Sequence, residues 1–180
     1  MNVLVPVAHG SESLETVTLV NILRRGDIRV TVASIEDGLQ VRGTRDIPLL
    51  ADARLADLGA QDYDAIVVPG GEAGARALGA HPGLAARLKQ QRLAHRWYGG
   101  ICAAPALTLA IHELLDGKKA TAYPAFRDQI IHYVDQPVVV DGHCVTGQGP
   151  AAAMAFGLKW VELLAGPSKA QEVAAALLHA

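Results

Sequence analysis

Short runs of consecutive apolar residues, rich in Val and Ile, recur along the chain in the lengths typical of buried β-strands. These runs predict strands at residues 2–8, 28–35, 63–71 and 97–101. Two further pairs of short extended segments each flank a glycine, one pair within 39–51 around Gly43 and one within 138–146 around Gly142. The second pair indicates a β-hairpin.

Between these runs, apolar residues recur at helical spacing. In residues 13–25 an apolar residue occupies every third position from Leu14 to Leu23, and Gly26 then ends the pattern. Further helices are expected from His81-Pro82 to about Arg96, from 105 to about 115, over 150–164 and over 168–179. Strands that alternate with helices predict an α/β fold, a mostly parallel central sheet with helices on both faces.

The length and composition of the chain are typical of one globular domain. The chain has 180 residues and shows no internal repeat, linker or low-complexity stretch, so residues 1–180 are expected to form a single domain. Hydrophobic residues make up 51% of the chain but aromatic residues only 4%. The core is therefore expected to consist mainly of Ala, Val, Leu and Ile.

Charge and hydropathy argue against large charged partners. The formal net charge is −2, with 16 basic and 18 acidic residues, which leaves no basic footprint for nucleic acid or for a membrane surface. No apolar run approaches the roughly 20 residues that span a bilayer, and the N-terminus lacks the basic start of a secretory signal. Because the chain lacks such a signal, its two cysteines are expected to be free thiols in a reducing compartment and not a disulfide. We therefore expect a cytoplasmic protein with a small substrate.

Cys102 is the strongest candidate for chemistry. It follows the strand at 97–101 directly and precedes a helix, within Gly99-Gly100-Ile101-Cys102-Ala103-Ala104-Pro105. A nucleophile on a tight strand-to-helix turn is lifted clear of the backbone, and the N–H groups at a helix start lower the pKa of a thiol. The alternative, an inert buried thiol, describes most cysteines and stays open at this point.

Two other strand ends carry residues that suit such a nucleophile. Glu15 lies in the first turn of the helix at 13–25, where its carboxyl group could shuttle a proton if burial raises its pKa, whereas Glu12 suits a helix-capping role. Gly70-Gly71 ends the strand at 63–71, where backbone N–H groups could hold an oxyanion. Because the carboxyl ends of parallel strands meet at one edge of a sheet, we expect these residues to lie close to Cys102.

Taken together, three motifs in this order resemble a known family. They are Gly10-Ser11-Glu12-Ser13-Leu14-Glu15-Thr16, Val68-Pro69-Gly70-Gly71 and Ile101-Cys102-Ala103-Ala104-Pro105. The chain is similar to the ThiJ/PfpI superfamily, in particular to its branch of parkinsonism-associated protein deglycases, which includes small bacterial oxidative-stress chaperones. The similarity runs nearly end to end, through Thr44-Arg45-Asp46, Pro124 and Gln148-Gly149-Pro150.

The resemblance implies a flavodoxin-like three-layer sandwich, a homodimer and no cofactor. It makes Cys102 the oxidation-sensitive nucleophile and Glu15 the protonated acid that hydrogen-bonds it. The residues that it assigns to the anion pocket are Gly70, Gly71 and Ala103. Residues that it places near the site or at the dimer contact are Leu14, Arg25, Arg45, Tyr123 and Pro150.

The chain departs from the family pattern at two positions near the nucleophile. Many relatives have a histidine directly before the proline at Pro124, where this chain has Tyr123. The protease-like branch has a histidine directly after its cysteine, where this chain has Ala103. The first departure removes an acid/base group, and the second argues against a peptidase.

Three functions remain open from the sequence. The first is a glutathione-independent glyoxalase or deglycase that acts on methylglyoxal or early glycation adducts. The second is a redox-sensing holdase chaperone in which Cys102 is oxidised to sulfinic acid. The third and weakest is an amidotransferase-like hydrolase, which would need His112 or His132 as its base. The seven histidines are scattered without metal-ligand spacing, so no metal is expected.

Overall fold

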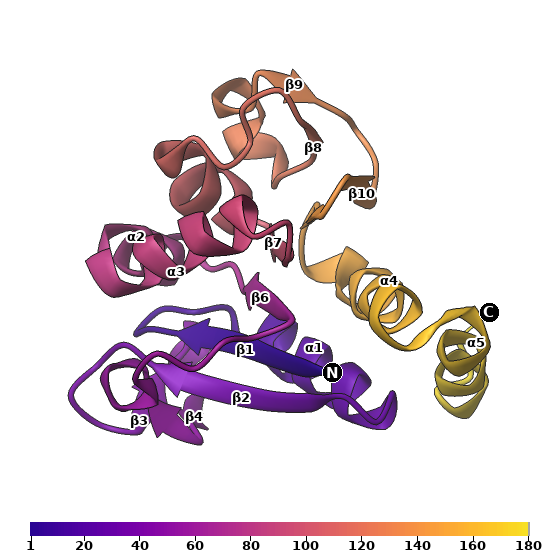
Figure 1. Ribbon diagram of the computed structural model, residues 1–180, viewed down its shortest axis with the longest axis horizontal. Helices are drawn as coiled ribbons and strands as arrows, with labels where there is room; N and C mark the ends of the chain where they lie inside the picture. The colour runs from indigo at the N-terminus through magenta and orange to yellow at the C-terminus, as the bar shows by residue number, and fades with distance from the viewer. Residues whose placement is uncertain (180) are drawn as a thin grey trace.

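The computed structural model describes residues 1–179, which form a seven-stranded sheet flanked by helices (Figure 1). The strands of the chain are β1 (Asn2–Val7), β2 (Arg29–Ser34), β3 (Gln40–Arg42), β4 (Pro48–Leu50), β5 (Ala53–Arg54), β6 (Ala65–Val68), β7 (Trp97–Ile101), β8 (Lys119–Ala120), β9 (His132–Tyr133), β10 (Val138–Asp141) and β11 (Cys144–Gly147). The α-helices are α1 (Ser13–Arg25), α2 (Glu72–Ala80), α3 (Pro82–Leu93), α4 (Ala153–Ala165) and α5 (Pro167–Ala176). Shorter helical segments are η1 (Thr44–Asp46), η2 (Leu55–Leu58), η3 (Pro105–Leu109), η4 (Ala110–His112), η5 (Pro124–Gln129) and η6 (Pro150–Ala152).

The sheet has the order β10-β11-β7-β6-β1-β2-β5. Its pairings are parallel, except that β10 and β11 form the predicted antiparallel hairpin. Five neighbouring strands of this sheet, β2-β1-β6-β7-β11, follow the flavodoxin-like order 2-1-3-4-5. In this order the second strand lies on one side of the first strand, and all later strands are added on the other side. The predicted α/β class and its mostly parallel sheet are confirmed.

Both faces of the sheet are buried, which explains why its central strands are apolar without interruption. On β1, Leu4 belongs to a core that includes Leu78 of α2 and Leu88 of α3. Its neighbour Val5 belongs to a second core with residues of α1 and α4, including Trp160. Figure 1 shows α2 and α3 together, well separated from α4 and α5.

Two helical segments differ from the sequence-based expectation. Helix α2 was not predicted, because Gly74 and Gly79 weaken its helical pattern. The helix expected from 105 to about 115 is instead wound as a π-helix over Pro105–Leu109, followed by a 3-10 turn that ends at His112. This wider winding occurs where the segment packs closely on α2, with the Thr108 hydroxyl donating to the Ala75 carbonyl at 2.8 Å.

The carboxyl ends of β1, β6 and β7 lie side by side because these three strands are parallel neighbours. The loop after β1 is tied to the loop after β6 by a backbone hydrogen bond from the Glu12 N–H to the Gly70 carbonyl, at 2.8 Å. The fold therefore brings together the three strand ends that the sequence singled out.

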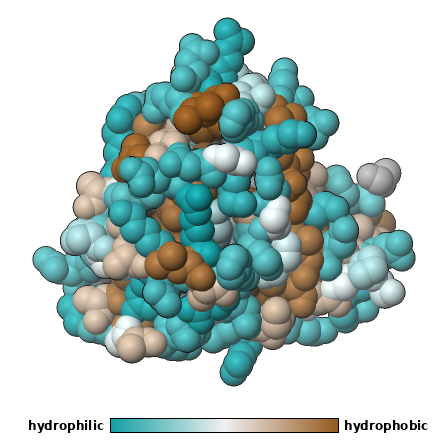
Figure 2. Space-filling view, turned by 45° about the horizontal axis from the view of Figure 1, so that its top comes forward, coloured by the Kyte–Doolittle hydropathy of each residue, from teal (hydrophilic) through white to brown (hydrophobic). Residues whose placement is uncertain are grey.

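The molecular surface is mixed in character. Figure 2 shows a face that is mainly hydrophilic, with separate apolar areas between the polar side chains. Within residues 1–179, no helix has both the length and the apolar character that a membrane crossing requires.

Candidate active site

Cys102 occupies a tight turn directly after β7, as predicted. Its backbone φ is 64°, in the left-handed region, where a residue with a side chain is strained by about 1 kcal/mol or more. Two hydrogen bonds hold this conformation: the Cys102 N–H donates to the Gly147 carbonyl at 2.9 Å, and its carbonyl accepts from the Tyr123 N–H at 2.8 Å. The thiol is partly exposed. Its neighbours therefore fix the strained turn and present the sulfur at the sheet edge.

The Gly70-Gly71 pair lies against this turn and leaves no room for side chains. A Cβ at Gly70 would lie 2.5 Å from the Cβ of Cys102 and 2.6 Å from Oε2 of Glu15. Gly71 has a φ of 84°, and a Cβ there would meet the Gly10 carbonyl oxygen at 2.2 Å. The backbone N–H groups of Gly71 and Ala103 favour the charged form of the Cys102 thiol and so lower its pKa. The pair thus allows the backbone to approach the sulfur closely.

Glu15 is buried beside the thiol, with 1% of its surface exposed. Its Oε2 accepts a hydrogen bond of 2.8 Å from the Gly70 N–H. The carboxyl group also interacts with the Cys102 thiol, but within residues 1–179 Oε1 has no partner at full hydrogen-bond geometry. A buried carboxyl oxygen without a partner is costly when it is charged. It is therefore well suited to carry a proton.

The environment raises the pKa of Glu15 to about 7. Burial is the largest cause, because it penalises the charged carboxylate, and the nearby charge of Glu12 adds to it. Hydrogen bonds from Gly70 and Cys102 act in the opposite direction. Glu15 therefore changes its protonation state near neutral pH, where a proton shuttle is most efficient.

The expectation of a lowered pKa at Cys102 is wrong. Burial, followed by the charge of Glu15, raises the pKa of the thiol to about 12, although the N–H groups of Gly71 and Ala103 oppose this shift. The raising contribution from Glu15 disappears when that carboxyl group is protonated. The thiol and the carboxyl group are thus coupled, and a proton on Glu15 favours the thiolate at Cys102.

Glu12 has the capping role that the sequence suggested. It is the N-cap of α1, where its side chain accepts from the Leu14 N–H at 3.3 Å and from the Thr44 hydroxyl at 2.8 Å. The helix start is thereby fixed against the loop that contains Arg45. Glu15, one turn further on, stays available for Cys102.

Four of the residues expected near the site or at the dimer contact fall into two places. Leu14, Arg45 and Pro150 line one groove of about 520 Å³ at the start of α1. Arg25 instead lies in the last turn of α1, bonded to Asn21 at 2.8 Å. Ten residues of helix place it about 15 Å along α1 from Glu15. Within one chain the structure does not bring Arg25 to the thiol.

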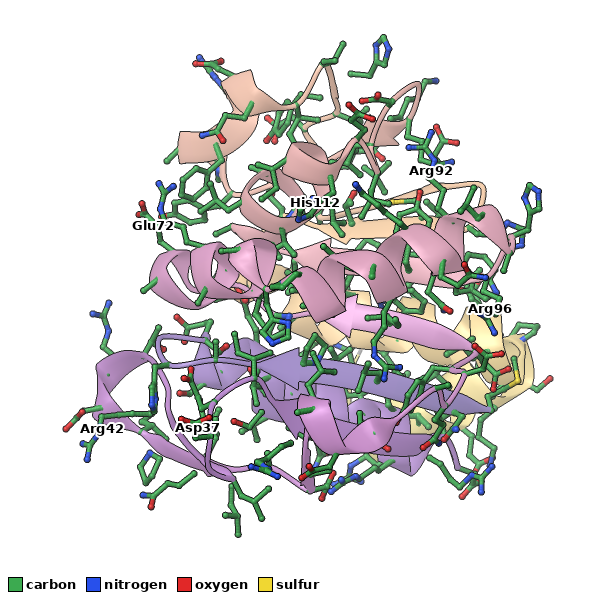
Figure 3. All side chains as sticks on the ribbon, turned by 60° about the vertical axis from the view of Figure 1, so that its left-hand side comes forward. Asp37, Arg42, Glu72, Arg92, Arg96 and His112 are labelled. Atoms are coloured by element: carbon green, nitrogen blue, oxygen red, sulfur yellow. The ribbon has the colours of Figure 1, made fainter. Side chains whose placement is uncertain are left out.

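The two histidines that were candidate bases for a hydrolase have other surroundings. The His112 ring donates to the Gly79 carbonyl at 2.7 Å, and in Figure 3 its side chain lies against the layer of α2 and α3. His132 is exposed on the short strand β9. Neither is among the largest causes of the raised pKa of the thiol. In the described part of the chain, no cluster of three or more His, Cys, Asp or Glu residues could hold a metal ion.

The sequence reasoning missed one residue that positions the nucleophile. The Gly147 carbonyl accepts the Cys102 N–H, so the end of β11 anchors the turn after β7. The hairpin predicted within 138–146 stops just before Gly147, and the pairing of β11 with β7, which places Gly147 opposite Ile101, appears only in the structure.

A comparison with family models matches residues 1–163 to the DJ-1/PfpI family. The chain belongs to the DJ-1/PfpI family. The expected membership is thereby confirmed. A DJ-1/PfpI structure from Toxoplasma gondii, described as oxidized DJ-1, is 40% identical and superimposes with a TM-score of 0.98 over 99% of this chain and 98% of that chain.

Curated DJ-1/PfpI relatives differ in length. Protein DJ-1 homolog A of Arabidopsis thaliana is 41% identical over 180 residues, which is 98% of this chain but 46% of the relative. The chain thus spans less than half of that protein. The glutathione-independent glyoxalase DJ-1 of Schizosaccharomyces pombe is 35% identical over 176 residues, with 91% of each chain covered.

Proposed function

We propose that this protein is a glutathione-independent glyoxalase and deglycase that acts on methylglyoxal or early glycation adducts through Cys102. The observation that carries this proposal is the buried carboxyl group of Glu15, with a pKa of about 7, beside a partly exposed cysteine on a strained turn. The name of the S. pombe relative supports the same reaction class.

The reaction begins with addition of the Cys102 thiol to the aldehyde carbon of the substrate. A C–S bond forms, the aldehyde oxygen receives a proton, and the product is a hemithioacetal. The N–H groups of Gly71 and Ala103, which lower the pKa of the thiol in the free protein, would stabilise the negative charge that develops on that oxygen.

Glu15 then moves a proton within the adduct. As a carboxylate it removes the proton from the hemithioacetal carbon, and as an acid it returns a proton to the adjacent former ketone carbon. The result is a thioester of a 2-hydroxy acid on Cys102. Water cleaves the thioester, which releases lactate from methylglyoxal and restores the thiol. Overall, one aldehyde and one water give one hydroxy acid, with no external oxidant.

A redox-sensing chaperone is the second candidate, because the same geometry suits stepwise oxidation of Cys102. Peroxide would oxidise the thiolate to sulfenic and then to sulfinic acid, and protonated Glu15 could donate a hydrogen bond to the product. The relative from T. gondii carries the word oxidized in its description, which supports this alternative. Catalysis would then be incidental.

The deciding experiment measures methylglyoxal consumption and lactate production without glutathione, on the wild type and on Cys102→Ser. Turnover that is lost in the variant supports the glyoxalase. An intact wild type without turnover, whose Cys102 is readily oxidised by peroxide, favours the sensor. A homodimeric state and a cytoplasmic location also remain part of this proposal.

A further inference from the structure

Tyr123 places an aromatic ring at the same edge of the sheet as the nucleophile. Its backbone N–H donates to the Cys102 carbonyl, and 45% of its surface is exposed. Tyrosine rings usually bury much of their apolar area, so an exposed ring on a residue whose backbone is bonded to the nucleophile is available for a ligand.

The orientation of the ring is restricted from one side. A Cβ at Gly149 would lie 3.3 Å from Cδ2 and 3.9 Å from Cε2 of Tyr123, so the ring packs directly on the backbone of this glycine. The ring of Phe126 lies 6.5 Å away, centroid to centroid, at an interplanar angle of 54°. Gly149 follows shortly after Gly147, the residue that anchors Cys102. The ring and the nucleophile are therefore held by the same strand end.

We propose that the exposed side of the Tyr123 ring binds the substituent on the ketone carbon, which adjoins the reacting aldehyde, and selects substrates in which this substituent is planar. This proposal rests on the proposed function and specifies its substrate class. An aryl or guanidinium group can stack on the tyrosine ring, whereas the methyl group of methylglyoxal offers no flat face. The preferred substrates are thus α-oxoaldehydes, or their adducts, that carry a planar π system.

The position of Tyr123 explains why an aromatic residue can replace a histidine here without loss of the nucleophile. The Tyr123 backbone, which holds Cys102, does not depend on the side chain. The side chain is therefore free to set specificity, while proton transfer depends on Glu15. Substitutions of the ring should alter substrate preference more than the reactivity of the thiol.

The experiment compares kcat/KM for phenylglyoxal and methylglyoxal in the wild type, Tyr123→Phe and Tyr123→Leu. Phenylalanine keeps the ring, whereas leucine keeps apolar bulk without a π face. The ratio of phenylglyoxal to methylglyoxal should fall by about threefold to tenfold in the leucine variant and stay within about twofold in the phenylalanine variant. An unchanged ratio in the leucine variant would overturn the proposal.

A second readout separates this inference from the proposed function. Alkylation of Cys102 by N-phenyl iodoacetamide and by iodoacetamide requires no turnover. The preference for the phenyl reagent should fall in Tyr123→Leu but persist in Tyr123→Phe. If the wild type turns over neither aldehyde, the glyoxalase proposal fails, and the alkylation ratio alone then supports or overturns the role of Tyr123.

Discussion

Cys102 and Cys144 belong to neighbouring parallel strands but lie at opposite ends of them. Cys102 follows the carboxyl end of β7. Cys144 is the first residue of β11 and pairs with Tyr98, near the amino end of β7. The environment raises the pKa of both thiols to about 12. At Cys144, which is 2% exposed, the cause is mainly burial. At Cys102 the charge of Glu15 is the second cause.

This difference shows that a raised pKa does not by itself mark a thiol as inert. Burial cannot be removed while the protein stays folded, but the charge of Glu15 is removed whenever that group binds a proton. Protonation of Glu15 therefore makes the Cys102 thiolate less unfavourable, although the effect of burial remains. Access, backbone strain and a titratable neighbour distinguish Cys102, the proposed nucleophile, from Cys144.

The largest expected effect comes from exchanging Cys102 for serine, and Cys144→Ser is the matched control. Cys102→Ser should reduce methylglyoxal turnover by about 1,000-fold or more, because a hydroxyl is a far weaker nucleophile than a thiolate. Cys144→Ser should keep turnover within about threefold in the same glutathione-free assay. Equal losses in two folded variants would remove the functional distinction between the two sites.

The next effect concerns stability and tests the cost of the buried charge on Glu15. Its pKa is about 7 in the folded protein, against an ordinary value of 4.5, so the folded state binds this proton more tightly. The stabilisation from the proton is complete below pH 4.5 and is lost as the pH rises through 7. The loss amounts to about 3 kcal/mol.

Glu15→Gln carries no such charge. Its free energy of unfolding relative to the wild type should therefore rise by about 3 kcal/mol between pH 4.5 and pH 8, measured by urea denaturation. Glu12→Gln, a change in the same helix turn, is the control for removal of an N-cap carboxylate. A relative stability of Glu15→Gln that does not depend on pH would contradict the buried charge.

Chemical labelling gives a third contrast. In the native protein, iodoacetamide should modify Cys102 at least about 100-fold faster than Cys144, because the buried thiol reacts only after local or global opening. Peptide mass spectrometry over a time course measures both rates. In urea the two rates should converge, and comparable native rates would show that exposure does not separate the two sites.

The smallest effect has opposite signs at the two positions. Because Cys102 has a φ of 64°, Cys102→Gly should be more stable than Cys102→Ala by up to about 1 kcal/mol. At Cys144, within a strand, glycine should be less stable than alanine by about 1 kcal/mol. Urea denaturation of the four variants tests this, and the same sign at both positions would exclude strain at the Cys102 turn.

Much of the site could be predicted because it depends on strand ends. Once β1, β6 and β7 are parallel neighbours, Glu15, Gly70 and Cys102 must meet at one edge. The direction of the pKa shift at Cys102 could not be predicted, because it depends on burial and on the distance to Glu15, which no local pattern contains.

Helix α2 was missed for a related reason. A Cβ at Gly74 would lie 2.4 Å from the Ser11 nitrogen, so this glycine serves close packing between segments far apart in the sequence. In the sequence alone, the same residue indicates a break. The π-helical winding of Pro105–Leu109 likewise accompanies contacts with α2 that a periodic pattern does not reveal.

The central claim is that Glu15 transfers protons for the chemistry at Cys102 and does not merely support the thiol. The most direct test measures methylglyoxal turnover and Cys102 alkylation together in Glu15→Gln. We predict that turnover falls by about 100-fold or more, because an amide cannot shuttle a proton, while alkylation changes by less than about tenfold. Full aldehyde turnover in the glutamine variant would contradict this role for Glu15.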